Sequence, residues 1–129
     1  MFQIDVMSRV PIYEQLIEQM EKFILTGTVS PEDQIPSVRS LSVKLSINPV
    51  TILKAYNELS ARGLIHSVPG KGYFVCKDAR EKLSQHKREL LEGLFAMASE
   101  LALAGIDRSE LLDIIDAAYV SPSNDGDPD

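Results

Sequence analysis

Between Pro11 and Gly27, apolar residues recur at intervals of three and four, the spacing of one face of an α-helix. Pro11 suits the first turn of such a helix and Gly27 suits its end. The helix face consists of Tyr13, Leu16, Ile17, Met20 and Ile24. The next residues, 30–33, have the sequence Ser-Pro-Glu-Asp, which is typical of a turn, and Gln34-Ile35 is predicted as a short extended piece.

Two further helices are predicted in quick succession between residues 37 and 62. Ser37 can cap a short helix whose apolar positions are Val38, Leu41 and Leu45. Asn48-Pro49 then marks a sharp helix start, with Asn as N-cap and Pro at the first helical position. The apolar stripe of this next helix is Ile52, Ala55, Tyr56 and Leu59. Two short helices joined by a link of about three residues predict a helix-turn-helix.

After Gly63 the pattern changes from helical spacing toward the alternation of β-strands. Residues 64–68 and 73–76 are β-prone, and Pro-Gly-Lys-Gly joins them. A hairpin directly behind a helix-turn-helix is the winged-helix arrangement. Its tip carries Lys71 between Gly70 and Gly72, a cation with little bulk around it that suits close approach to a phosphate backbone.

From residue 78 the pattern predicts a long helix of about 25 residues that ends at Gly105, and then a second helix from Asp107 to about Tyr119. Two such helices hold more leucine than they can bury between themselves. A second copy of the chain, related by a twofold axis, would cover the excess. The alternative is that both helices pack back on the first domain. The expected dimer contacts are Leu83, Leu90, Leu94, Met97, Leu101, Leu111 and Ile115.

These elements predict a mainly α fold with a small β-hairpin. Residues 1–77 form a winged helix-turn-helix domain, with the helix-turn-helix at about 37–62 and the wing at 64–76. Residues 78–120 form a two-helix dimerisation module. The Pro/Asp/Gly-rich end, residues 121–129, is expected to be an acidic disordered tail.

Charge is distributed unevenly along the 129 residues. The net charge is −6, yet residues 36–77 carry six lysines and arginines against the single acid Glu58, a net charge of +5. A basic middle between acidic flanks is a local electrostatic footprint for a polyanion. The alternative is a chance segregation of solvated charges.

Several kinds of chemistry are not supported by the composition. The single cysteine, Cys76, excludes an internal disulfide framework and a zinc site of several thiolates. His66 and His86 have no partners at metal-ligand spacing, and no catalytic constellation assembles. We therefore expect no enzyme, no metal and no cofactor. Neither a secretory signal nor a membrane span is visible, which predicts a cytoplasmic protein.

The ordered set of motifs resembles the GntR family of bacterial transcription regulators, in its short YtrA-like branch. The matching stretches occur in the family's order and spacing across residues 11–77, and they are PIYEQL, IPSVRSLSVKL, INPVTILKAYNEL and RGLIHSVPGKGYFV. The C-terminal helices are also similar to the brief dimerisation module of this branch. The resemblance implies a dimeric, sequence-specific DNA-binding regulator, most often a repressor on an inverted repeat, with a neighbouring transporter operon as a common target.

The family pattern also implies roles for single residues. Arg39 matches a DNA-contacting position, for which the alternative is a surface salt bridge, and 70–72 match the wing tip. Asn48 at the start of the recognition helix has a competing role as N-cap. The candidate DNA-binding residues are Ser37, Arg39, Asn48, Val50, Thr51, Lys54, Gly70, Lys71 and Gly72.

Two departures from the family pattern limit what the resemblance implies. Many members have arginine where this chain has Pro49 and Leu53, so the operator sequence does not follow from theirs. Glu32 stands where glycine is frequent, which leaves the turn type open. A winged helix used only for protein–protein contact is the alternative function. No residue cluster identifies a small-molecule effector, and its existence stays open.

Overall fold

The computed structural model describes residues 2–120. The chain divides into two compact units, with the boundary between Gln85 and His86. We call residues 2–85 unit 1 and residues 86–120 unit 2. The predicted acidic tail, residues 121–129, lies outside the described residues.

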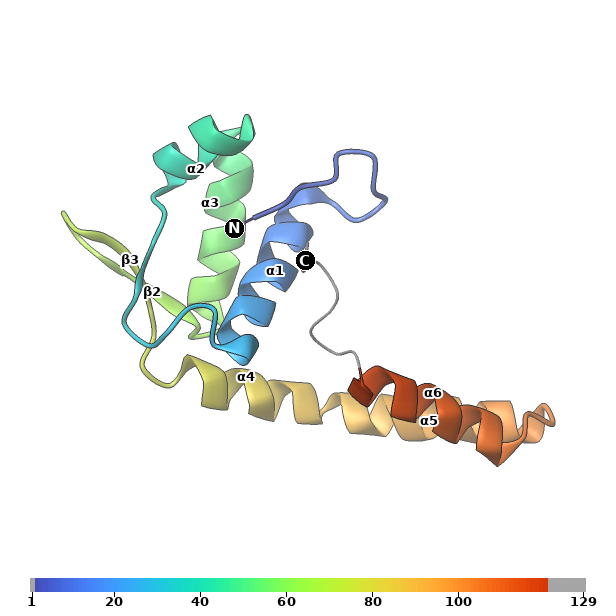
Figure 1. Ribbon diagram of the computed structural model, residues 1–129. Coiled ribbons are helices and arrows are strands. Elements are labelled where there is room, and N and C mark those ends of the chain that lie inside the picture. Colours follow the sequence, from blue (N-terminus) through green and yellow to red (C-terminus); the bar gives the residue numbers. More distant parts are fainter. Residues whose placement is uncertain (1, 121–129) are drawn as a thin grey trace. The chain divides into compact units, whose positions relative to one another are not determined.

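Helices α1, α2 and α3 lie in unit 1 (Figure 1). Their bounds are Ile12–Thr26 for α1, Val38–Leu45 for α2 and Pro49–Ala61 for α3, and α3 packs against both α1 and α2. The predicted helix starts are confirmed, because Ser37 Oγ accepts a hydrogen bond from the Ser40 amide at 3.0 Å and Asn48 Oδ1 accepts one from the Val50 amide at 2.8 Å. Each bond satisfies a backbone donor that the helix itself leaves without a partner. The helix-turn-helix is thus fixed by its own local sequence.

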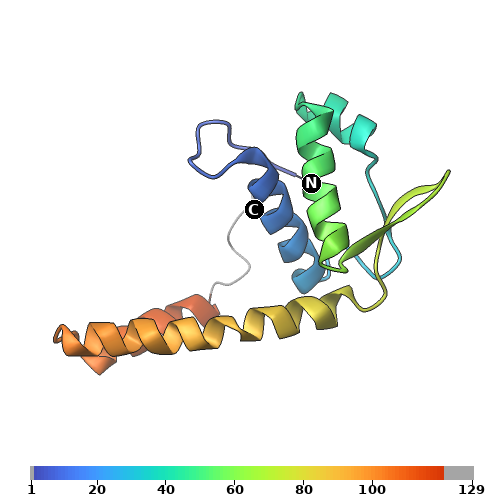
Figure 2. The same ribbon diagram turned by 180° about the vertical axis from the view of Figure 1, so that it is seen from behind.

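A three-stranded antiparallel sheet completes the winged helix. The strands are β1 (Gln34–Ile35), β2 (Ile65–Val68) and β3 (Gly72–Val75), in the order β1-β3-β2. β2 and β3 form the predicted hairpin, with Ile65 opposite Val75, and the short extended piece pairs with β3 as β1. The hairpin projects away from the helices (Figures 1 and 2).

Glu32 occupies the turn position at which the family often has glycine. Its φ of 69° lies in the left-handed region, and the amide of Asp33 donates to Ser30 O at 3.1 Å. A turn with proline at its second residue and a positive φ at its third is a type II turn. Glycine adopts that positive φ with the least steric strain. The turn therefore keeps a glycine-type conformation with glutamate in it, and the Glu32 amide ties it to β3 by donating to Val75 O at 2.8 Å.

The core of unit 1 lies where α1, α3 and the sheet meet. Tyr56 and Leu59, both assigned to the core from the sequence, are 0% and 1% exposed. The Tyr56 hydroxyl donates to Pro36 O at 2.7 Å, and its burial raises the pKa of this phenol. The buried ring and its hydrogen bond fix α3 to the segment that leads into α2.

The first turns of α4 (Ala79–Arg88) belong to unit 1, which corrects two expectations. Ala79 and Leu83 are each 2% exposed and join the hydrophobic core of this unit. The winged-helix unit therefore continues past residue 77, as far as Gln85. Leu83 was expected at a dimer interface, and that assignment is wrong because its side chain is already covered by its own chain.

Unit 2 contains the end of α4, then α5 (Leu90–Leu103) and α6 (Arg108–Val120). The chain reverses direction between α5 and α6 (Figure 1). Glu89 separates α4 from α5 but keeps helical angles of φ −63° and ψ −23°, so the predicted long helix is present in two segments. No residue of α5 or α6 is buried.

Candidate nucleic-acid interface

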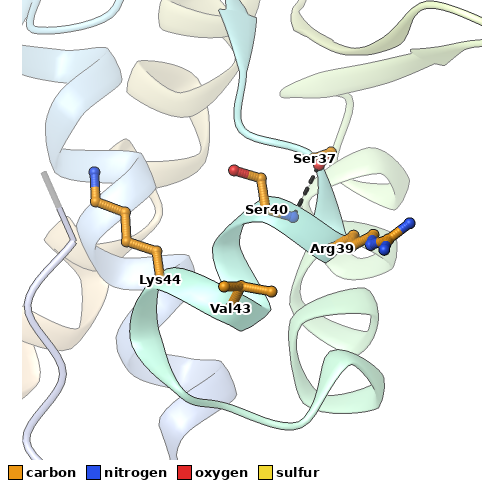
Figure 3. Close-up of a pocket in the computed structure, with 5 residues that line it drawn as sticks. All are labelled: Ser37, Arg39, Ser40, Val43 and Lys44. Atoms are coloured by element: carbon orange, nitrogen blue, oxygen red, sulfur yellow. Dashed lines mark hydrogen bonds between the residues drawn. The ribbon is translucent and has the colours of Figure 1, made fainter.

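Exposed cations and hydroxyls gather on the outer face of α2. An open surface depression is lined by Ser37, Arg39, Ser40, Val43 and Lys44 (Figure 3). The Ser37 hydroxyl is engaged in the helix cap, and the side chains of Arg39 and Lys44 point away from each other on the two sides of the helix. Two cations on one exposed helix suit contacts with phosphates on either side of it.

The first turn of α3 presents a different kind of surface. Asn48 and Val50 are exposed, and Thr51 is half-buried. The side-chain oxygen of Asn48 is the N-cap acceptor, so the competing structural role of this residue is confirmed. In helix-turn-helix proteins the first turn of the second helix is the part that contacts base edges in the major groove.

Lys54 lies against α1. Its Nζ atom is 3.9 Å from the centre of the Tyr13 ring, close enough for a cation–π interaction. The residue is exposed, so this contact orients the cation without removing it from solvent. Tyr13 was assigned to the core-facing stripe of its helix, and its contact with Lys54 is a second role that helical spacing did not predict.

The wing tip is braced from the neighbouring strand. Gly70 and Lys71 are exposed, and the Lys71 amide donates to Val68 O at 2.9 Å to close the turn. The Gln34 side chain donates from Nε2 to Lys71 O at 2.7 Å. Gly72 has a φ of +121°, and a Cβ atom there would lie 2.9 Å from Gln34 Nε2, so glycine leaves the room that this brace needs.

The nine candidate DNA-binding residues thus fall into three groups within unit 1. They are Ser37 and Arg39 at the start of α2; Asn48, Val50, Thr51 and Lys54 at the start of α3; and Gly70, Lys71 and Gly72 at the wing tip. Sequence reasoning missed Ser40 and Lys44 in the α2 depression and Gln34 behind the wing. Lys44 was already part of the basic segment, whereas the role of Gln34 depends on strand pairing, which no local pattern shows.

The structure brings Cys76 near a histidine that is distant in sequence. Its Sγ lies 3.6 Å from Nδ1 of His66. Burial raises the pKa of the Cys76 thiol, which opposes the thiolate that a nucleophile needs. Within residues 2–120 no group of three or more His, Cys, Asp or Glu side chains could hold a metal ion. In the same range no helix has the length and apolar character to cross a bilayer.

Residues 12–75 match the family described as "Bacterial regulatory proteins, gntR family". The HTH-type transcriptional repressor YtrA of Bacillus subtilis (strain 168) is 38% identical over 112 residues, which cover 86% of each chain. The chain belongs to the GntR family. The match to YtrA confirms the resemblance to the YtrA-like branch.

Solved structures of relatives agree with this membership. YtrA from Sulfolobus acidocaldarius, a GntR-family transcription factor, is 32% identical with a TM-score of 0.65 over 77% of this chain and 97% of its own. The DNA-binding domain of AraR, solved in complex with operator ORX1, is 32% identical with a TM-score of 0.51 over 57% of this chain and 92% of its own.

These relatives decide between the functions that the sequence left open. They are named as transcriptional regulators and not as enzymes, and the AraR domain was solved on operator DNA. This GntR-family chain is a sequence-specific DNA-binding regulator, and a winged helix restricted to protein contact is not favoured.

Proposed function

We propose that this protein is a dimeric repressor that binds an inverted-repeat operator through α2, α3 and the wing of each protomer. The observation that carries the proposal is the exposed, basic surface of the GntR-type winged helix. Arg39 is exposed on a helix whose other face builds the core, and Lys71 is exposed in the turn between β2 and β3. In this proposal the two cations contact phosphates and the first turn of α3 enters the major groove.

The proposal of a dimer rests on the uncovered apolar side chains of unit 2. Leu90, Leu94, Met97 and Ile115 are 65%, 48%, 60% and 39% exposed, and Leu101 and Leu111 are half-buried. Apolar side chains repeated along two helices are what a twofold contact between identical chains would cover. Residues 86–120 therefore serve as the proposed dimerisation module.

A symmetric dimer constrains the DNA that it can bind. Two recognition helices related by a twofold axis would enter major grooves about 34 Å apart on one face of the duplex. We propose that the site lies upstream of the protein's own gene or of a neighbouring operon, for which the family resemblance suggests a transporter. The proposal places the protein in the cytoplasm with its DNA.

Hydroxyl-radical footprinting of the upstream region tests this function. We expect two protected stretches, symmetric about one centre and separated by about one helical turn of 10–10.5 base pairs or a multiple of it. A scrambled duplex of the same composition should show no protection. A single unsymmetric footprint would contradict the dimeric arrangement, and equal protection of both duplexes would contradict specific binding.

A further inference from the structure

The first turn of α3 exposes apolar side chains to solvent. Val50 is 70% exposed there, and Leu53 in the next turn is 41% exposed, although the other face of the helix is packed. No charged residue occurs from Asn48 to Leu53. On the winged-helix fold this turn is the segment that enters the major groove. The groups available to contact bases there are therefore mainly methyl groups.

Two polar side chains near this turn make contacts within the protein. Asn48 Oδ1 accepts a hydrogen bond from the Val50 amide at 2.8 Å, which competes with the bidentate pairing of an asparagine with adenine. The Lys54 ammonium lies 3.9 Å from the centre of the Tyr13 ring. Arg39 belongs to α2, the helix that crosses the DNA backbone in this arrangement.

Thymine is the base that presents a methyl group in the major groove. The C5-methyl group of thymine distinguishes its edge there, whereas the other groups are hydrogen-bond donors and acceptors. Building on the proposed function, we propose that Val50 is a specificity-determining residue that recognises the C5-methyl group of a thymine in each operator half-site. The half-exposed Thr51 beside it offers a second methyl group to the same groove.

Deoxyuridine in place of thymidine tests this inference without altering the protein. The exchange removes one methyl group and keeps every hydrogen-bonding group of the base pair. Single thymines within the two footprinted stretches would be replaced in turn, and the affinity of the full chain measured by fluorescence anisotropy at fixed salt. We expect a three- to fivefold loss of affinity at one symmetry-related position per half-site. This is about the contribution of burying one methyl-sized group. No loss at any position would overturn the inference.

A double-mutant cycle assigns the contact to Val50. Val50→Ala should weaken binding to the thymine duplex three- to tenfold, and the deoxyuridine exchange should then have no further effect. The matched control is Val6→Ala, because Val6 is an equally exposed valine (74%) outside the helix-turn-helix and the wing, and this variant should keep its full response to the exchange. Circular dichroism of both variants should match that of the unmodified protein, because neither side chain belongs to the core.

The outcomes separate the inference from the function on which it rests. Specific binding to the thymine duplex with an unchanged response in Val50→Ala would overturn the role of Val50 and leave the regulator function standing. Failure to prefer the upstream duplex over a scrambled one would overturn both.

Discussion

Units 1 and 2 differ in whether their apolar side chains are buried within the unit. In unit 1 the stripes of α1 and α3 are covered, and residues such as Met20, Ile52 and Tyr56 are 0% exposed. In unit 2 the helices α5 and α6 have no buried residue, and Phe95 and Tyr119 are 76% and 82% exposed. An apolar stripe therefore predicts that a helix face will be covered, but not by which chain.

The largest expected effect is the difference in stability between two leucine-to-alanine substitutions, one in each unit. Leu59→Ala in the core of unit 1 should lower the free energy of unfolding by about 2–5 kcal/mol, because it removes buried methyl groups and leaves a cavity. Leu103→Ala at a 91% exposed position of unit 2 should change it by less than about 0.5 kcal/mol. Urea denaturation at one fixed protein concentration measures both. Equal losses would contradict the contrast between the units.

Leu94→Asp tests whether a second chain covers unit 2. A charge at this 48% exposed position should convert dimers to monomers and lower operator affinity about 100-fold, because two half-sites would no longer be bound by one particle. Sedimentation equilibrium and anisotropy measure the two effects. Val6→Asp, at a 74% exposed position of unit 1, is the matched control and should remain dimeric. A stable Leu94→Asp dimer would exclude Leu94 from the interface.

Arg39→Ala and Lys71→Ala test the basic surface of unit 1. Each should weaken DNA binding about tenfold and reduce the slope of log affinity against log salt by about 1, because one phosphate contact is lost. Oligomeric state should not change. Arg108→Ala removes the same charge from α6 of unit 2 and should leave affinity and slope as they are. Unchanged binding in both unit 1 variants would remove the phosphate-contacting role of this surface.

The smallest effect concerns the brace behind the wing. Gln34→Ala removes the 2.7 Å hydrogen bond to Lys71 O and should weaken operator binding by up to about fivefold, the equivalent of one bond worth about 1 kcal/mol. The matched control is Gln19→Ala, which removes a comparable link to the backbone of Gln3 away from the wing. If the losses of binding free energy in Gln34→Ala and Lys71→Ala add up in the double variant, Gln34 does not act through Lys71.

Local signals in the sequence predicted most of unit 1. The caps at Ser37 and Asn48, the turn before Gln34 and the glycines around Lys71 each fix backbone conformation within a few residues. These features set the helix-turn-helix and the wing before any long-range contact is known. The GntR resemblance then supplied the roles of the exposed side chains.

The features that escaped prediction depend on contacts between distant residues. Leu83 shares the apolar spacing of the following helix, yet it packs into the core of unit 1, and spacing alone does not distinguish these two environments. Tyr13 beneath Lys54 and Gln34 beside Lys71 are likewise separated from their partners by dozens of residues. Such pairings follow from tertiary packing, which periodicity and capping signals do not predict.

The most direct test of the account is the salt dependence of binding to the protein's own upstream duplex, measured beside a scrambled duplex by fluorescence anisotropy. We expect tighter binding to the upstream duplex at every salt concentration and a linear fall of log affinity with log salt, because cations of unit 1 displace counterions from phosphates. Weak binding that is equal on both duplexes and insensitive to salt would contradict the assignment of α2, α3 and the wing as a specific DNA-binding surface.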